Sequence, residues 1–169
     1  RIISMSSREA GKISKTYFDF LKNHGDPRLK HTVAVYTDPF DVTTKNTDPA
    51  VQKGLPNGLD RNSLPNDPSY DPSLPGQEHQ YSGVNRDVFA KLDGYRMFIT
   101  YGETQLLLAE AAVRGWITAD AATLYNNGVK GAMQLLSQYD ASATITEQEI
   151  TDYLTRNPFV GAGDKEAAL

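Results

Sequence analysis

Residues 100–116 read TYGETQLLLAEAAVRGW, and this stretch decides the fold that the sequence predicts. Thr100 and Glu103 have the spacing of a capping box, in which side chains satisfy backbone N–H groups of the first helical turn. From Leu106 to Val113 the residues are apolar on almost every side, so we expect a helix buried between neighbours. Gly115 stands where a left-handed residue commonly ends a helix.

A first helix is predicted upstream, over residues 8–24. Ser6 and Glu9 have capping-box spacing, and Gly25 lies at the expected C-terminal cap. Its apolar positions fall on one helical face: Ile13, Tyr17, Phe20 and Leu21. The alternation over His31 to Thr37 then predicts a short strand.

Two further helices are predicted downstream, over residues 119–138 and 147–156, where Thr146 and Glu149 repeat the capping box. With the helix over 101–114, the first of them has the large and small residues of a tetratricopeptide hairpin. The positions that meet this pattern are Leu108, Ala109, Ala121, Tyr125 and Gly128. Glycine in a helix costs about 1 kcal/mol, which close packing of the two helices would offset. The alternative is an ordinary antiparallel pair with alanine at its contact.

A long segment from Asp38 to Asp93 lacks helical periodicity, and seven of the nine prolines lie between Pro39 and Pro75. Prolines reduce the entropy lost on ordering, so we expect a mainly ordered loop, which is typical of functional segments. Tyr70 and Tyr81 are its candidate ligand-binding residues, because sugar rings stack on aromatic side chains. Both tyrosines could instead anchor the loop to the helices, and Trp116 is interpreted as a packing residue.

Composition excludes several classes of function. The net charge of −4 and the absence of basic runs argue against nucleic-acid binding and against a polybasic membrane patch. The chain has no cysteine, which excludes disulfides, thiolate metal sites and a cysteine nucleophile. The three histidines, His24, His31 and His79, have no partners at metal-ligand spacing, and no catalytic motif or cofactor-binding motif is present. Asp60 begins a stretch like a calcium loop, but Pro65 occupies the position that needs glycine.

The helix entry over residues 96–116, with its Tyr-x-Glu-x-x-Leu-Leu-Leu-Ala-Glu-Ala core, resembles SusD/RagB-like outer-membrane nutrient-binding lipoproteins. The next helix, from Ala122 to Val129, is similar to the same family, as are Ile13 to Phe18 followed by Asp26 to Leu29. Gly54 to Gly58 resembles the branch that carries a long loop at this place. The matches occur in the family's order.

The resemblance implies an all-α dominated fold with a tetratricopeptide-like helix pair, a long irregular loop region and at most a short strand. We expect residues 1–96 and 97–169 to form the loop-bearing and helical regions of one domain that is truncated at both ends. It also implies a non-enzymatic protein of the cell surface of Bacteroidetes, lipid-anchored to the outer membrane through a cysteine that lies outside this chain. Such a protein binds an oligosaccharide or other nutrient oligomer and delivers it to a TonB-dependent SusC-like transporter.

Two classes of function therefore remain open. One is the nutrient-binding lipoprotein, and the other is a tetratricopeptide-like module that docks a protein partner without a small ligand. The long loop favours the first, because an adaptor repeat has short turns between its helices.

Overall fold

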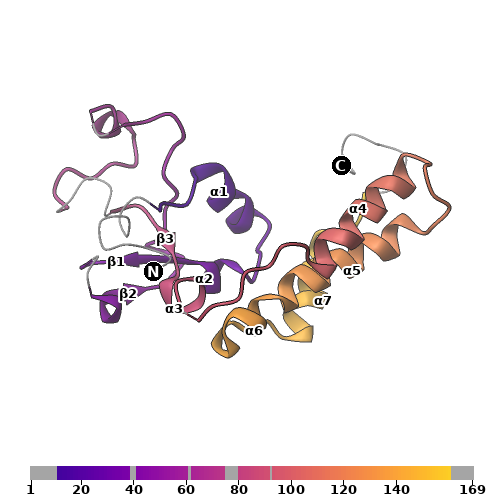
Figure 1. Cartoon of the computed structure of the whole chain (residues 1–169). Coiled ribbons are helices and arrows are strands. Elements are labelled where there is room, and N and C mark those ends of the chain that lie inside the picture. Colours follow the sequence, from indigo (N-terminus) through magenta and orange to yellow (C-terminus); the bar gives the residue numbers. More distant parts are fainter. Residues whose placement is uncertain (1–10, 39–40, 61, 75–79, 92, 161–169) are drawn as a thin grey trace. The chain divides into compact units, whose positions relative to one another are not determined.

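The computed structural model describes residues 11–38, 41–60, 62–74, 80–91 and 93–160. The chain divides into two compact units, Arg1–Gly94 and Tyr95–Leu169, each with its own internal packing. The elements of both are labelled in Figure 1.

The first unit is built on helix α1 (Lys15–Asn23), the short helix α2 (Leu29–Thr32) and a small sheet (Figure 1). Strand β1 (Val33–Tyr36) lies between β2 (Lys45–Asn46) and β3 (Gly83–Val84), antiparallel to both. Short 3₁₀ turns, η2 (Val42–Thr44) and η3 (Leu64–Asn66), and helix α3 (Arg86–Phe89) complete it. Its buried apolar cluster contains Phe18, Leu21, Leu29 and Val33.

Helix α1 begins later than the sequence predicts. Its first residue is Lys15, and the Ser14 side chain caps it by accepting from the backbone N–H of Tyr17. The preceding residues are extended, because Ile13 donates to the Ser82 carbonyl at 2.8 Å and accepts from the Leu55 backbone N–H at 2.8 Å. Those pairings prevent residues 12–14 from joining a helix. The predicted capping residues Ser6 and Glu9 lie outside the described residues.

The predicted strand is confirmed as β1, but it has two partners where at most one short strand was expected. Val35 pairs with Asn46, and Val33 pairs with Val84. Both partner strands come from the Pro-rich segment and are two residues long. A strand of two residues carries no alternating pattern, so sequence periodicity could not reveal it.

The second unit is helical: α4 (Tyr101–Val113), α5 (Ala121–Gln134), α6 (Leu136–Tyr139), the 3₁₀ turn η5 (Ala141–Ala143) and α7 (Glu147–Arg156). Thr146 and Glu149 form the predicted capping box completely, whereas Thr100 accepts from the backbone N–H of Glu103 without the return bond. The helix predicted over 119–138 is divided at Leu135, whose backbone angles stay helical. Gly115 has a φ of 75°, as its predicted capping role requires.

Helices α4 and α5 cross in close contact at their glycines, as the sequence predicts for Gly128. A Cβ on Gly128 would lie 2.6 Å from Leu106 Cγ, and one on Gly131 would lie 2.7 Å from Tyr101 Cδ1. Gly102, on the facing helix, meets backbone atoms, because its Cβ would lie 2.7 Å from the backbone nitrogen of Ala132. The glycines therefore allow a close approach of the two backbones, and at Gly102 no side chain could move aside to admit a larger residue.

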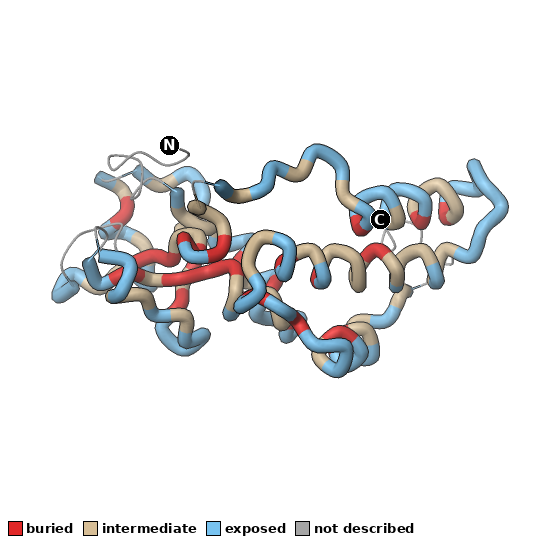
Figure 2. Tube along the Cα trace, turned by 60° about the horizontal axis from the view of Figure 1, so that its bottom comes forward, coloured by how far each residue is buried: buried red, intermediate tan, exposed pale blue. Residues whose placement is uncertain are grey.

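The prediction that α4 is buried on almost every side is wrong for the second unit taken alone. Ala109 and Val113 are buried, but Leu107 is 59% exposed. Figure 2 shows that buried positions along α4 and α5 are separated by exposed or intermediate ones. The physical reason is that α5 covers one side of α4, and the other described residues of the second unit leave part of its apolar surface exposed.

The predicted fold class is confirmed, since helices dominate and the sheet is small. Among the described residues, no helix is both long enough and apolar enough to span a membrane.

Candidate functional site

Lys53 holds together the part of the Pro-rich segment that carries both candidate tyrosines. Its Nζ donates to the backbone carbonyl of Ser69 at 2.6 Å and to Gln80 Oε1 at 2.7 Å, and it lies 4.9 Å from the centre of the Tyr81 ring. Gln80 Oε1 also accepts from the backbone N–H of Asp71 at 2.8 Å. The Lys53 ammonium thus joins residue 53 to residue 69 and to residues 80–81, which are distant from it in sequence.

A second set of hydrogen bonds joins residues 52–53 to residue 82. The backbone N–H of Lys53 donates to Ser82 Oγ at 3.0 Å, and that of Ser82 donates to the Lys53 carbonyl at 2.8 Å. The Ser82 hydroxyl in turn donates to Gln52 Oε1 at 2.5 Å, and Gln52 Nε2 donates to the Asn46 carbonyl at 2.6 Å. Gln52 and Ser82 are buried, so these bonds satisfy polar groups that water does not reach.

Acidic groups surround the Lys53 ammonium and set the electrostatics of the site. Burial lowers the pKa of Lys53, and the charges of Asp71 and Asp67 oppose that shift. Hydrogen bonds from the Ser73 side chain and backbone lower the pKa of Asp71, so this carboxylate stays ionised. An ionised carboxylate beside loop amides and an aromatic ring can accept hydrogen bonds from hydroxyl groups, which is the chemistry of sugar recognition.

The two tyrosines singled out by sequence have different surroundings. Tyr81 is fully buried, and its hydroxyl has no hydrogen-bond partner among the described residues. Burial raises its pKa; the Ser69 side chain opposes the shift without reaching hydrogen-bond geometry. Tyr70 is only half-buried. The surroundings of Tyr81 favour the anchoring alternative for that residue, whereas part of Tyr70 is accessible to a ligand.

The loop is also fixed to the start of α1. Lys15 donates its backbone N–H to the Leu55 carbonyl at 2.7 Å. A Cβ on Gly54 would lie 2.5 Å from Lys15 Cα, so only glycine fits at this approach of two backbones. Gly58, with a φ of 81°, then turns the chain in a conformation that glycine adopts readily.

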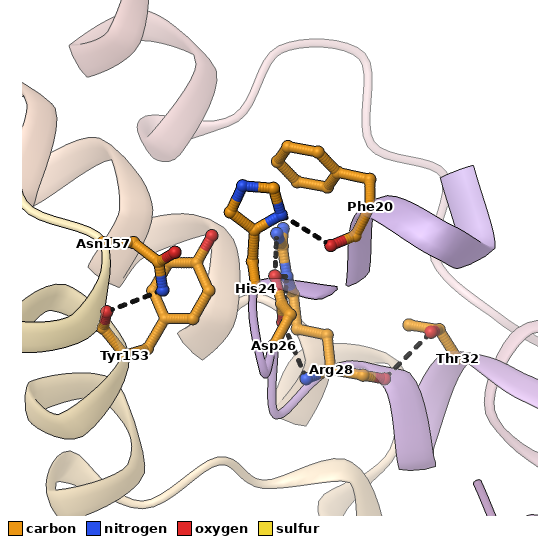
Figure 3. Close-up of polar contacts among 7 residues, drawn as sticks. All are labelled: Phe20, His24, Asp26, Arg28, Thr32, Tyr153 and Asn157. Carbon is orange, nitrogen blue, oxygen red and sulfur yellow. Dashed lines mark hydrogen bonds and ion pairs between the residues drawn. The ribbon is translucent and has the colours of Figure 1, made fainter. Parts of the chain in front are cut away.

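The turn that follows α1 is closed by polar contacts (Figure 3). His24 Nδ1 lies 2.8 Å from the Phe20 carbonyl oxygen. The buried Asp26 carboxylate accepts from the Arg28 backbone at 2.9 Å and from its guanidinium, with Nη2 at 2.6 Å. Because these donors occupy the carboxylate, Asp26 has a structural role.

No group of three or more potential metal ligands is found among the residues that the structure describes. The Asp60 carboxylate accepts from the Asn62 backbone at 3.1 Å and from the Ser63 hydroxyl at 2.6 Å. These bonds close a local turn and lower the pKa of Asp60. His79 lies outside the described residues.

Trp116, in the second unit, is exposed and not packed as the sequence suggested. Its side chain is 72% exposed, where a packing residue was expected, and the Arg114 guanidinium lies 5.2 Å from its ring centre. Its place directly after the C-terminal cap Gly115, in the turn before α5, is the signal that could have indicated exposure.

The chain is similar to a family of known proteins over nearly its whole length. The model of the SusD-like family described as "starch-binding associating with outer membrane" matches residues 2–165. No curated protein matches the chain.

Solved structures are similar over most of the chain. A chitin-binding protein shares 26% identity and a TM-score of 0.66, with 90% of this chain and 31% of that protein covered. A SusD-like protein described as Bacteroidetes AC2a has 21% identity and a TM-score of 0.70, covering 93% and 37%. A SusD homologue from Bacteroides fragilis NCTC 9343 has 22% identity and a TM-score of 0.63, covering 92% and 33%. The chain thus spans about a third of the length of these proteins.

Proposed function

The chain belongs to the SusD-like family of starch-binding proteins associated with the outer membrane, and from this premise we propose that it is part of a cell-surface glycan-capture protein. The whole protein binds an oligosaccharide or a similar nutrient oligomer without altering it chemically. The observation that carries the proposal is the family match over residues 2–165, and the similar chitin-binding protein supports a glycan as the ligand class.

Within this chain, the proposed contribution to binding is the loop held by Lys53. Tyr70 is only half-buried, and the charges of Asp67 and Asp71 act on Lys53 in the same part of the loop. A sugar ring stacked on Tyr70 would place its hydroxyls where those carboxylates can accept hydrogen bonds. The proposed contribution of Tyr81 is indirect, because its ring packs against the Lys53 ammonium that holds the loop.

The proposal is tested by binding of the full-length protein to an array of starch-derived, chitin-derived and other oligosaccharides, followed by substitution. Tyr70→Ala should weaken binding roughly 5- to 150-fold, the equivalent of losing about 1–3 kcal/mol of aromatic burial, with the melting temperature little changed. Tyr17→Ala is the matched control, since Tyr17 is also partly exposed and lies on α1. Tyr81→Ala should instead lower the melting temperature, because the Tyr81 side chain is fully buried.

If the Tyr70 and Tyr81 variants both bind as the wild type does, neither tyrosine contributes to binding and the proposed role of this loop is overturned. If Tyr70→Ala simply unfolds, that tyrosine is structural. If the wild-type protein binds no oligosaccharide on the array, the proposed function itself is overturned.

We further propose that the protein delivers its ligand to a TonB-dependent SusC-like transporter and is lipid-anchored to the outer membrane. The acidic helical unit is proposed to face the transporter. Purification from native membranes under mild detergent tests this arrangement. The expected result is co-elution with a TonB-dependent porin, and a full-length protein that never co-elutes with one would contradict the partnership.

A further inference from the structure

The sequence holds two Asn–Gly pairs, Asn57–Gly58 and Asn127–Gly128, and the structure places them in opposite surroundings. The backbone nitrogen that follows an asparagine can attack the side-chain amide, and it does so most easily in glycine, which has no Cβ to shield it. Asparagine is accordingly counted among the thermolabile residues of proteins. The two pairs therefore present one reactive motif in two structural contexts of the same chain.

Asn57–Gly58 lies in an open turn of the Pro-rich segment. Both residues are exposed, and Gly58 has a φ of 81° with nothing within 4 Å of the place where a Cβ would stand. Among the residues that the structure describes, no hydrogen bond reaches the Asn57 side-chain amide or the Gly58 backbone N–H. The two groups thus have no such bond to break before they approach each other.

Asn127–Gly128 lies within α5, where the same reaction is hindered twice. The Gly128 N–H takes part in the helix, in which each amide donates to the carbonyl four residues back. Gly128 is also buried, and a Cβ on it would lie 2.6 Å from Leu106 Cγ and 3.1 Å from the Gly102 carbonyl oxygen. A cyclic product at Gly128 would require the helix to open and its packing on α4 to loosen.

We propose that Asn57 is a site of spontaneous deamidation in the folded protein, whereas α5 protects Asn127. The Gly58 nitrogen attacks Asn57 Cγ, so that a new N–Cγ bond forms and the Cγ–Nδ2 bond breaks. Nδ2 leaves as ammonia, with the proton that the Gly58 nitrogen loses. Water then adds to either carbonyl of the cyclic succinimide and opens it, which gives aspartate or isoaspartate at position 57. The steps involve no oxidation or reduction.

The isoaspartyl product should weaken the attachment of the loop to the start of α1. Its backbone runs through Cβ and is longer by a methylene, and it carries a new negative charge. Shortly before it in the chain, Leu55 donates to the Ile13 carbonyl at 2.8 Å and accepts from the Lys15 backbone N–H at 2.7 Å. Gly54 approaches Lys15 so closely that a Cβ would lie 2.5 Å from Lys15 Cα. So tight a contact tolerates little displacement of the adjoining backbone. The inference does not depend on glycan binding.

Ageing of the full-length protein in mildly alkaline buffer, followed by peptide mass spectrometry, tests the proposal. The Asn57 peptide should gain the mass difference between an amide and an acid, and should separate into aspartyl and isoaspartyl forms. Its rate should exceed that of the Asn127 peptide at least about tenfold, since tenfold corresponds to roughly 1.4 kcal/mol, the scale of one helical hydrogen bond. In protein unfolded by urea, both peptides should react at similar rates.

Asn57→Gln is the matched variant, because its amide is further from the next nitrogen by a methylene and would have to close a larger ring. It should stay unmodified under the same conditions. Hydrogen exchange at the Leu55 and Lys15 amides should be faster in aged than in fresh wild-type protein, and ageing should not change it in Asn57→Gln. Equal rates at Asn57 and Asn127 in the folded protein, or an unreactive Asn57, would overturn the proposed site. Unchanged exchange in fully modified protein would overturn its effect on the loop.

Discussion

Replacing Gly102 with alanine tests the packing of α4 on α5 where the backbones of the two helices meet. The new Cβ would lie 2.7 Å from the Ala132 backbone nitrogen and 2.8 Å from the Gly128 carbonyl oxygen. Both are backbone atoms, so relief requires the two helices to separate. Overpacking of this kind costs about 1–3 kcal/mol, while alanine's better helix propensity returns at most about 1 kcal/mol. We expect a net loss of about 1–2 kcal/mol.

Gly128→Ala is the matched control on the facing helix. Its Cβ would meet Leu106 Cγ at 2.6 Å and the Gly102 carbonyl oxygen at 3.1 Å, but the Leu106 side chain is 38% exposed and can rotate away, which leaves only the longer backbone contact. The cost should then nearly cancel the gain in helix propensity, leaving stability within about 1 kcal/mol of the wild type. Urea denaturation of the full-length protein, followed by far-UV circular dichroism, measures both variants. A Gly102→Ala variant as stable as wild type, or one more stable than Gly128→Ala, would refute the reasoning.

Three further predictions concern the loop and the helix caps. Gly54→Ala should lower the melting temperature clearly because Lys15 leaves no room for a Cβ, whereas Gly11→Ala, with nothing within 4 Å, should not. Lys53→Met should cost about 1–2 kcal/mol by removing two hydrogen bonds to the loop, and should speed amide exchange at Ser82. The pKa of Asp120 is lowered mainly by its hydrogen bond from the Thr123 side chain, so its contribution is present above its ordinary pKa of about 4 and lost as pH falls through the lowered value. Asp120→Asn should therefore weaken the fall of stability below pH 4 in an acid titration.

Local signals predicted the helical unit well. Capping residues at positions 100 and 146 mark the true starts of α4 and α7, because an N-terminal cap is a contact between residues two or three apart. The glycines of α5, Gly128 and Gly131, likewise indicated close packing, and in the structure they lie against Gly102 of α4. Helix caps and helical glycines depend on residues that are near in sequence, so a single sequence is enough to predict them.

The loop unit was harder to predict because its contacts are long-range. Lys53 forms hydrogen bonds with Ser69 and Ser82, which lie 16 and 29 positions away, and no local sequence pattern predicts such long-range bonds. The same region of the loop contains Tyr81, for which the sequence left ligand binding and loop anchoring open, and only the structure shows that its side chain is fully buried. The exposure of Leu107 has a different origin, since burial of an apolar helix depends on partners that the described residues do not include.

Calorimetric titration of the full-length protein with starch-derived and chitin-derived oligosaccharides measures directly whether it captures glycans. We expect saturable binding of at least one oligosaccharide, with a negative heat-capacity change from apolar ring surface buried on aromatic side chains. Absence of binding heat across the series, from a protein that still unfolds cooperatively, would contradict it.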